Sequence, residues 1–138
     1  MSRFNQGIGD GYVKRIPVDK LKAKSLVKSA EEAVYAARKL PLEASTLKSI
    51  IRELYEALRQ YCEAIGYCNG FKFLSHEVIT FYLEEVIKEP RLAARFDRYR
   101  KIRNGINYYG DDVSEETVKE ALVEIPKIMD DLKKFIKL

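Results

Sequence analysis

Hydrophobic residues recur every three to four positions along five stretches of the chain, and no stretch of useful length alternates hydrophobic and polar residues. Apolar side chains at this spacing line one face of an α-helix, whereas alternation would indicate a strand. The pattern therefore predicts helices throughout. The five expected helices cover approximately residues 17–40, 45–69, 75–88, 90–108 and 114–136.

Proline, glycine and capping residues mark the ends of these helices. Pro41 ends the first helix, and the pair Asn69-Gly70 closes the second, because glycine readily takes the left-handed conformation. Ser75 is expected to cap the third helix and Ser114 the fifth. Pro126 lies inside the last helix and should kink it. We therefore predict an all-α, up-and-down bundle of about five helices, with the last helix kinked near Pro126.

The first 16 residues carry three glycines, which predicts a flexible N-terminal arm over residues 1–16. Residues 17–138 are expected to form a single helical-bundle domain, because no repeat or low-complexity segment interrupts them. Seven basic and two acidic residues lie within positions 1–28, although the whole chain carries a net charge of only +4. A basic segment of this kind could contact a phosphate backbone, or it could be a solvated helix start.

No apolar run approaches the roughly 20 residues that span a bilayer, and the first residues lack the apolar core of a signal peptide. We therefore expect a cytoplasmic protein without a membrane partner, in which Cys62 and Cys68 are free thiols. No glycine-rich phosphate loop or metal-spaced Cys/His set is present, so we expect no cofactor and no metal. His76, the only histidine, is either a packing or capping residue or a neutral general base.

The segment RYRKIRNGINYYG, residues 98–110, carries the most distinctive chemistry. On a helical wheel Arg100, Arg103 and Asn107 fall within about 60° of one another, at the margin of the apolar face. A guanidinium placed there can reach a carboxylate, a carbonyl or a phosphate. Gly105 costs about 1 kcal/mol relative to alanine inside a helix, which suggests close approach of another group or fraying. From the residues alone, a structural arginine network and an anion-binding site are equally open.

Two segments together resemble the archaeal and bacterial branch of the HEPN superfamily. They are YEALRQYCEAIGYCNGFKFLSHEVITFYLEEV and FDRYRKIRNGINYYGDDVSEETVKEAL, and the resemblance covers roughly residues 45–135. Its motifs are SH at a helix start, RxxRNxxxY before a glycine turn, and S-E-E opening the last helix. HEPN domains are up-and-down helical bundles and commonly homodimers. Many are metal-independent ribonucleases of toxin–antitoxin or defence systems, in which the antitoxin is a nucleotidyltransferase.

In this resemblance Arg103 matches the motif arginine of the family, and Asn104 matches the polar residue that follows it. The motif histidine is missing, since Tyr108 occupies the position after four intervening residues and Asn107 precedes it. Asparagine cannot transfer a proton near neutral pH, and tyrosine, with an ordinary pKa of about 10, is a poor general base. The resemblance therefore implies a HEPN-like domain without standard ribonuclease activity.

Three hypotheses for the function follow. The first is a domain that binds a nucleotide, RNA or a partner protein through a surface at the end of the fourth helix. The second is an active ribonuclease in which Arg103 stabilises the charged transition state and Tyr108 or His76 transfers the proton. The third is a structural, dimeric interaction module in which Arg103 pairs with carboxylates such as Asp97. The binding residues of the first hypothesis are Arg100, Arg103, Asn104, Asn107, Tyr108 and Tyr109.

Overall fold

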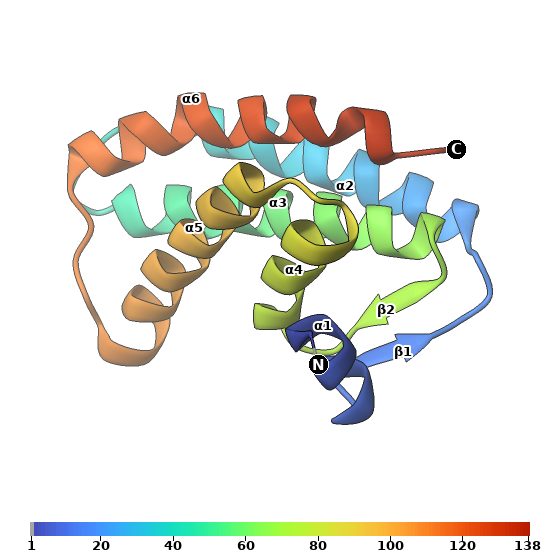
Figure 1. Ribbon diagram of the computed structural model, residues 1–138. Helices are drawn as coiled ribbons and strands as arrows, with labels where there is room; N and C mark the ends of the chain where they lie inside the picture. The colour runs from blue at the N-terminus through green and yellow to red at the C-terminus, as the bar shows by residue number, and fades with distance from the viewer. Residues whose placement is uncertain (1) are drawn as a thin grey trace.

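The structure, a computed structural model, describes residues 2–138, most of which are helical. Three long helices, α2 (Lys20–Lys39), α3 (Leu47–Cys68) and α6 (Glu115–Leu132), pack along one another, and α5 (Pro90–Tyr109) crosses them obliquely (Figure 1). The predicted all-α fold class is confirmed. The shorter elements are α1 (Arg3–Gly9), β1 (Val13–Arg15), β2 (Phe71–Phe73), α4 (Glu77–Phe81), the π-helical turn η1 (Tyr82–Val86) and the 3₁₀ turn η2 (Lys133–Phe135).

The helices α2 and α3 form the most extensive contact in the molecule. The carboxylate of Asp19 caps α2 by accepting a hydrogen bond from the Lys22 N–H at 2.9 Å, so the helix begins at Lys20 rather than near Pro17. The buried face of α2 is mostly alanine, and such small side chains let the two helix backbones approach closely. The buried residues of α2 are Ala23, Ala30, Ala33, Val34 and Ala37.

The helix α3 lies at the centre of the core, and hydrophobic residues that recur at helical spacing after Leu47 form a buried stripe along it. Each fully buried leucine or isoleucine of this kind contributes roughly 1.5–3 kcal/mol through the hydrophobic effect. The helix ends at Cys68, before the predicted Asn69-Gly70 pair, where Gly70 has a φ of 80°. The residues of the stripe are Ile50, Ile51, Leu54, Leu58, Tyr61, Cys62 and Ile65.

The last helix, α6, packs on α3 and completes the core. Ser114 caps it as predicted, because its hydroxyl oxygen accepts a hydrogen bond from the Thr117 N–H at 3.1 Å. The helix continues through Pro126 to Leu132, and the kink expected there stays a prediction. Across residues 2–138, none of the helices combines the length and the apolar character needed to cross a bilayer.

The N-terminal segment is not the flexible arm that was expected, and it contributes one of two strands that the hydrophobic pattern did not predict. In place of a flexible arm over residues 1–16, Ser2 caps α1, and β1 pairs with β2 in an antiparallel two-stranded ribbon; Met1 lies outside the described residues. The side chain of Phe4 is only 3% exposed and packs edge-on against Phe71 at 5.4 Å between ring centroids. Two buried anchors, Phe4 in α1 and Val13 in β1, therefore hold a glycine-containing segment whose composition suggested disorder. The strands escaped detection because three residues are too few for an alternating pattern.

The region between the ribbon and α5 also departs from expectation. Ser75 does not cap a helix; His76 occupies the N-cap of α4, and no side chain donates or accepts a capping hydrogen bond there. After Phe81 the chain continues as the π-turn η1 rather than as a regular helix, and Lys88 takes a positive φ of 62° before Pro90 opens α5. In this region α4 packs against α5, and α5 in turn packs against α3.

Candidate functional site

Arg103 lies on the C-terminal half of α5, where that helix crosses α3. Its guanidinium sits over the ring of Tyr55, 5.3 Å from the ring centroid, and its Nη1 donates a hydrogen bond to the side-chain oxygen of Asn104 at 3.1 Å. Within residues 2–138 it forms no ion pair, because no carboxylate oxygen lies within 4.0 Å of it. Arg103 is therefore a partly buried cation whose neighbours are an aromatic ring and an amide.

A second arginine without an ion pair among the described residues contacts the next turn of α5. The Nε of Arg52, an exposed residue of α3, donates a hydrogen bond to the side-chain oxygen of Asn107 at 2.8 Å. Lys48, one turn earlier, reaches the Gly110 carbonyl and the Asp112 carboxylate, each at 3.5 Å. Lys48, Arg52 and Tyr55 recur at helical spacing, so α3 presents one cationic and aromatic stripe to the end of α5. We call Arg52, Arg103, Asn104 and Asn107 the Arg103 surface.

His76 meets the Arg103 surface through Tyr55. Its Nδ1 lies 3.1 Å from the Tyr55 hydroxyl, and the two rings are 5.7 Å apart. Burial, together with the positive charges of Arg59 and Arg103, lowers the pKa of His76 to about 4, although the Glu56 carboxylate opposes this shift. Burial likewise raises the pKa of Tyr55 above its ordinary value, although Arg103 opposes this. A neutral imidazole that accepts a hydrogen bond from a protonated phenol satisfies both side chains at neutral pH.

Arg100 was expected to be a binding residue, but its guanidinium is already paired with carboxylates. Its guanidinium is bound to Asp97 through Nε at 2.8 Å and Nη2 at 2.7 Å, and Nη2 lies 3.7 Å from Glu77. Asp97 also accepts a hydrogen bond from the Thr80 hydroxyl at 3.0 Å. Burial alone would raise the pKa of Asp97, but hydrogen bonds from Arg100 and Lys101 outweigh it and hold that pKa below its ordinary value. Asp97, expected as a partner of Arg103, serves Arg100 instead.

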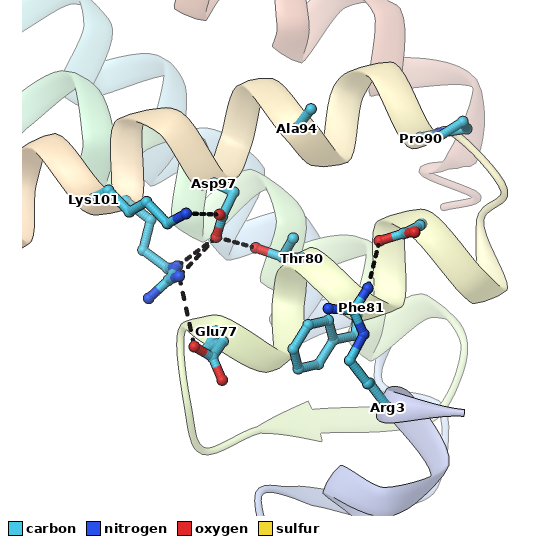
Figure 2. A pocket seen from close by; sticks show the side chains of 10 residues that line it. Arg3, Glu77, Thr80, Phe81, Pro90, Ala94, Asp97 and Lys101 are labelled. Carbon is cyan, nitrogen blue, oxygen red and sulfur yellow. Dashed lines mark hydrogen bonds and ion pairs between the residues drawn. The ribbon is translucent and has the colours of Figure 1, made fainter. Parts of the chain in front are cut away.

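Figure 2 shows the pocket that this network lines, a cavity of about 480 Å³ between α4, η1 and α5. Lys101 contacts Asp97 at 3.1 Å, and Arg3 reaches Glu84 at 3.5 Å across the opening. Three cations of the lining therefore face three carboxylates, Glu77, Glu84 and Asp97. Because these charges neutralise one another, the pocket offers no net attraction to an anion.

The predicted tyrosines and the glycine of the motif lie at the tip of α5. Tyr108 and Tyr109 are 71% and 82% exposed, next to Asn107. Gly105 has a close neighbour, since a Cβ atom at this position would stand 2.5 Å from a carboxylate oxygen of Asp111. The Asp111 N–H also donates to the Gly105 carbonyl at 3.1 Å. A carboxylate side chain therefore packs closely on this glycine near the end of α5.

Two residues of the site were missed at the sequence level, Arg52 and Tyr55. Their signal is the recurrence of Lys48, Arg52, Tyr55 and Arg59 along one edge of the apolar stripe of α3, which a helical wheel would have displayed. Arg59 itself is neutralised by ion pairs with Glu56 and Glu63 on its own helix. Within residues 2–138 no group of three His, Cys, Asp or Glu side chains is arranged to hold a metal ion.

No protein-family model matches the chain, and no curated protein matches its sequence. Within residues 2–138, the structure defines a helical domain in which two arginines at the crossing of α3 and α5 have asparagine partners and no carboxylate partners.

Proposed function

We propose that this chain is a HEPN-like helical domain that binds RNA through the Arg103 surface and lacks standard ribonuclease activity. The observation that supports it most is that Arg52 and Arg103 lack carboxylate partners among the described residues, and that each donates a hydrogen bond to an asparagine in the same two turns of α5. Two guanidinium groups placed together are complementary to a phosphodiester backbone, which accepts such planar donors in pairs.

The surroundings of the arginines suit a single strand. The Asn104 and Asn107 oxygens already accept hydrogen bonds from the arginines, so their amide nitrogens stay available as donors. Tyr108 and Tyr109 present exposed rings on which bases can stack, an interaction worth roughly 1–3 kcal/mol per base. The resemblance to the HEPN superfamily supports the same residues, because Arg103 and Asn104 match its motif.

The proposal is tested by fluorescence anisotropy with labelled single-stranded RNA. We expect Arg103→Ala to weaken binding about tenfold and to reduce the slope of log affinity against log salt by about 0.7, as for one lost phosphate contact. Arg91→Ala is the matched control, since Arg91 is an exposed arginine at the other end of α5. If Arg103→Ala binds RNA as tightly as wild type, the proposal is wrong.

A melting curve on the same variants separates binding from the structural hypothesis. Arg103 makes one hydrogen bond and one contact with an aromatic ring, so its removal should change stability by no more than about 1 kcal/mol. A much larger loss, with RNA affinity preserved in the folded fraction, would instead support the structural dimeric module.

A metal-independent ribonuclease is the second candidate. It is favoured by the hydrogen bond between His76 and the Tyr55 hydroxyl, because the Arg103 guanidinium lies over the ring of the same tyrosine. The low pKa of His76 leaves it neutral at pH 7, so it could accept a proton but not deliver one. RNA cleavage in the presence of a chelator tests this candidate. Cleavage that disappears in His76→Ala or Tyr108→Phe would establish it; its absence from a folded protein would leave binding alone.

The resemblance also extends the proposal to assembly. A homodimer would bring two Arg103 surfaces together and double the positive charge at the cleft. A nucleotide is a smaller ligand with the same phosphate chemistry. The partner protein that the family suggests is a nucleotidyltransferase antitoxin. Under this proposal the complex acts in the cytoplasm, without a membrane. Molar mass measured by light scattering tests the dimer, and copurification with a coexpressed nucleotidyltransferase tests the partner.

A further inference from the structure

The ribbon formed by β1 and β2 places two lysines directly opposite each other. Val13 pairs with Phe73, Lys14 with Lys72, and Arg15 with Phe71. Val13 and Phe73 are 2% and 8% exposed and face the core, so the alternation of strand residues turns Lys14 and Lys72 to the outer face. Figure 1 shows this ribbon at the end of the molecule where α2 begins.

The outer face of the ribbon continues beyond the two lysines. The Leu74 N–H donates to the Tyr12 carbonyl at 2.8 Å, so these residues form the next pair on the same face. Their side chains are 47% and 53% exposed. An aromatic ring therefore lies beside a lysine pair on a surface open to solvent, a combination that suits the bases and phosphates of a single strand.

The charge of this face is uncompensated within the described residues. Like charges directly opposite each other destabilise a strand pair, and neither Lys14 nor Lys72 forms an ion pair. Exposed lysines also begin α2, and Asp19 is the only acidic residue between positions 11 and 30. These further cations, Lys20, Lys22 and Lys24, form no ion pairs within residues 2–138. Such a surface is complementary to a polyanion.

The chain that follows β2 connects the ribbon to the Arg103 surface through His76. Lys72 and His76 are four residues apart, which spans at most about 14 Å of extended chain. Ser75 and Tyr12 line one cavity of about 510 Å³, and His76 touches the Tyr55 ring under Arg103. Two carboxylates also line this cavity; Glu77 lies near Arg100, and Asp10 is exposed.

We propose that the outer face of the ribbon, Tyr12, Lys14 and Lys72, is a second contact for RNA, which extends the strand held at the Arg103 surface. This inference rests on the proposed function. It predicts a dependence on RNA length, because a strand of three or four nucleotides can occupy the Arg103 surface alone, whereas a strand of about 20 reaches both regions.

The test measures RNA binding by the double variant Lys14→Gln/Lys72→Gln. The control is Lys127→Gln/Lys133→Gln, which removes the same number of exposed lysines near the other end of the sequence. For the long RNA we expect about tenfold weaker binding and a salt slope smaller by about 1.4, twice the value per contact. The short RNA should bind the double variant as tightly as wild type. Lys14→Arg/Lys72→Arg should retain wild-type affinity, and the melting temperature should not fall, because a repulsion has been removed.

The outcomes distinguish the two proposals. If the double variant binds the long RNA as wild type does while Arg103→Ala binds weakly, the ribbon contact is refuted and the Arg103 surface stands. If only the double variant binds weakly, the Arg103 surface is refuted, and with it the inference that the ribbon extends a strand held there. Exposed Val18 and Leu21, at 55% and 82%, make vesicles containing phosphatidylserine a necessary third arm. Vesicle binding that depends on Lys14 and Lys72, without an effect on RNA, would overturn the inference in favour of a bilayer surface.

Discussion

Arg100 and Arg103 lie less than one turn apart on α5, yet the structure uses them in different ways. Arg100, whose side chain is 12% exposed, is enclosed by Asp97 and Glu77. Arg103 has an asparagine and a tyrosine ring in place of carboxylates. The motif read from the sequence treats the two as equivalent cations. Their neighbours, contributed by α5 itself as well as by α3 and α4, decide that one guanidinium is bound by carboxylates and the other is not.

The largest expected effect concerns the paired arginine. Asp97→Ala would leave the guanidinium of Arg100 largely buried without its main carboxylate, and the Thr80 hydroxyl without its acceptor. We expect a loss of about 2–3 kcal/mol in the free energy of unfolding, less than for a fully buried pair. Urea denaturation measures it. Asp112→Ala is the control, because the Asp112 carboxylate pairs with Lys48 but is 99% exposed, and it should be nearly neutral.

The second effect concerns pH and belongs to the Arg103 region. An unfolded histidine titrates near 6.5, whereas folding lowers the pKa of His76 to about 4. As pH falls from about 6.5 to 4 the unfolded chain binds a proton that the folded protein rejects, so stability decreases across this window. Discounted for solvent that reaches the ring, the decrease is about 1–2 kcal/mol.

Equilibrium denaturation at pH 7 and pH 4.5 measures this decrease, with His76→Gln as the comparison. The variant should lose less stability over the interval, because acidic residues alone would then respond to pH. Arg103→Ala should also flatten the response, since it removes a positive charge that opposes protonation of His76. Identical pH responses in wild type and His76→Gln would show that the imidazole is not held neutral by the fold.

The contrast between the two arginines also shows which features of the fold and the site can be predicted from the sequence. Helical spacing predicted α2, α3, α5 and α6, since each has a long apolar stripe or a clear cap, such as Ser114. It missed the ribbon, because the order of residues 3–15 depends on where Phe4 and Val13 meet the rest of the chain. The motif likewise indicated Arg103. Whether an arginine has a carboxylate partner, however, depends on residues such as Asp97 and Glu77. The contact between Glu77 and Arg100 is a tertiary contact, and no local sequence pattern encodes it.

The third effect separates the arginines by ligand binding. Arg103→Ala should lose about 1.4 kcal/mol of RNA binding, a tenfold change in affinity, with little change in stability. Arg103→Lys should recover part of the affinity, because an ammonium keeps the charge but loses the planar pair of donors. Titrations at two salt concentrations distinguish the two contributions. Equal affinity of the Ala and Lys variants would mean that charge at this position does not matter.

The smallest effect tests Gly105, the glycine that follows the two arginines on α5. In Gly105→Ala the new methyl group would meet a carboxylate oxygen of Asp111, which belongs to an exposed residue and can rotate away. Alanine also favours the helix by about 1 kcal/mol. Because the displacement of Asp111 offsets part of that gain, we expect a net stabilisation of no more than about 0.5 kcal/mol, measured by thermal denaturation. Gly105→Ala/Asp111→Ala should recover the full gain, since the methyl group then has no opposing atom. A destabilised double variant would mean that the Gly105 backbone itself, rather than the Asp111 side chain, requires glycine at the end of α5.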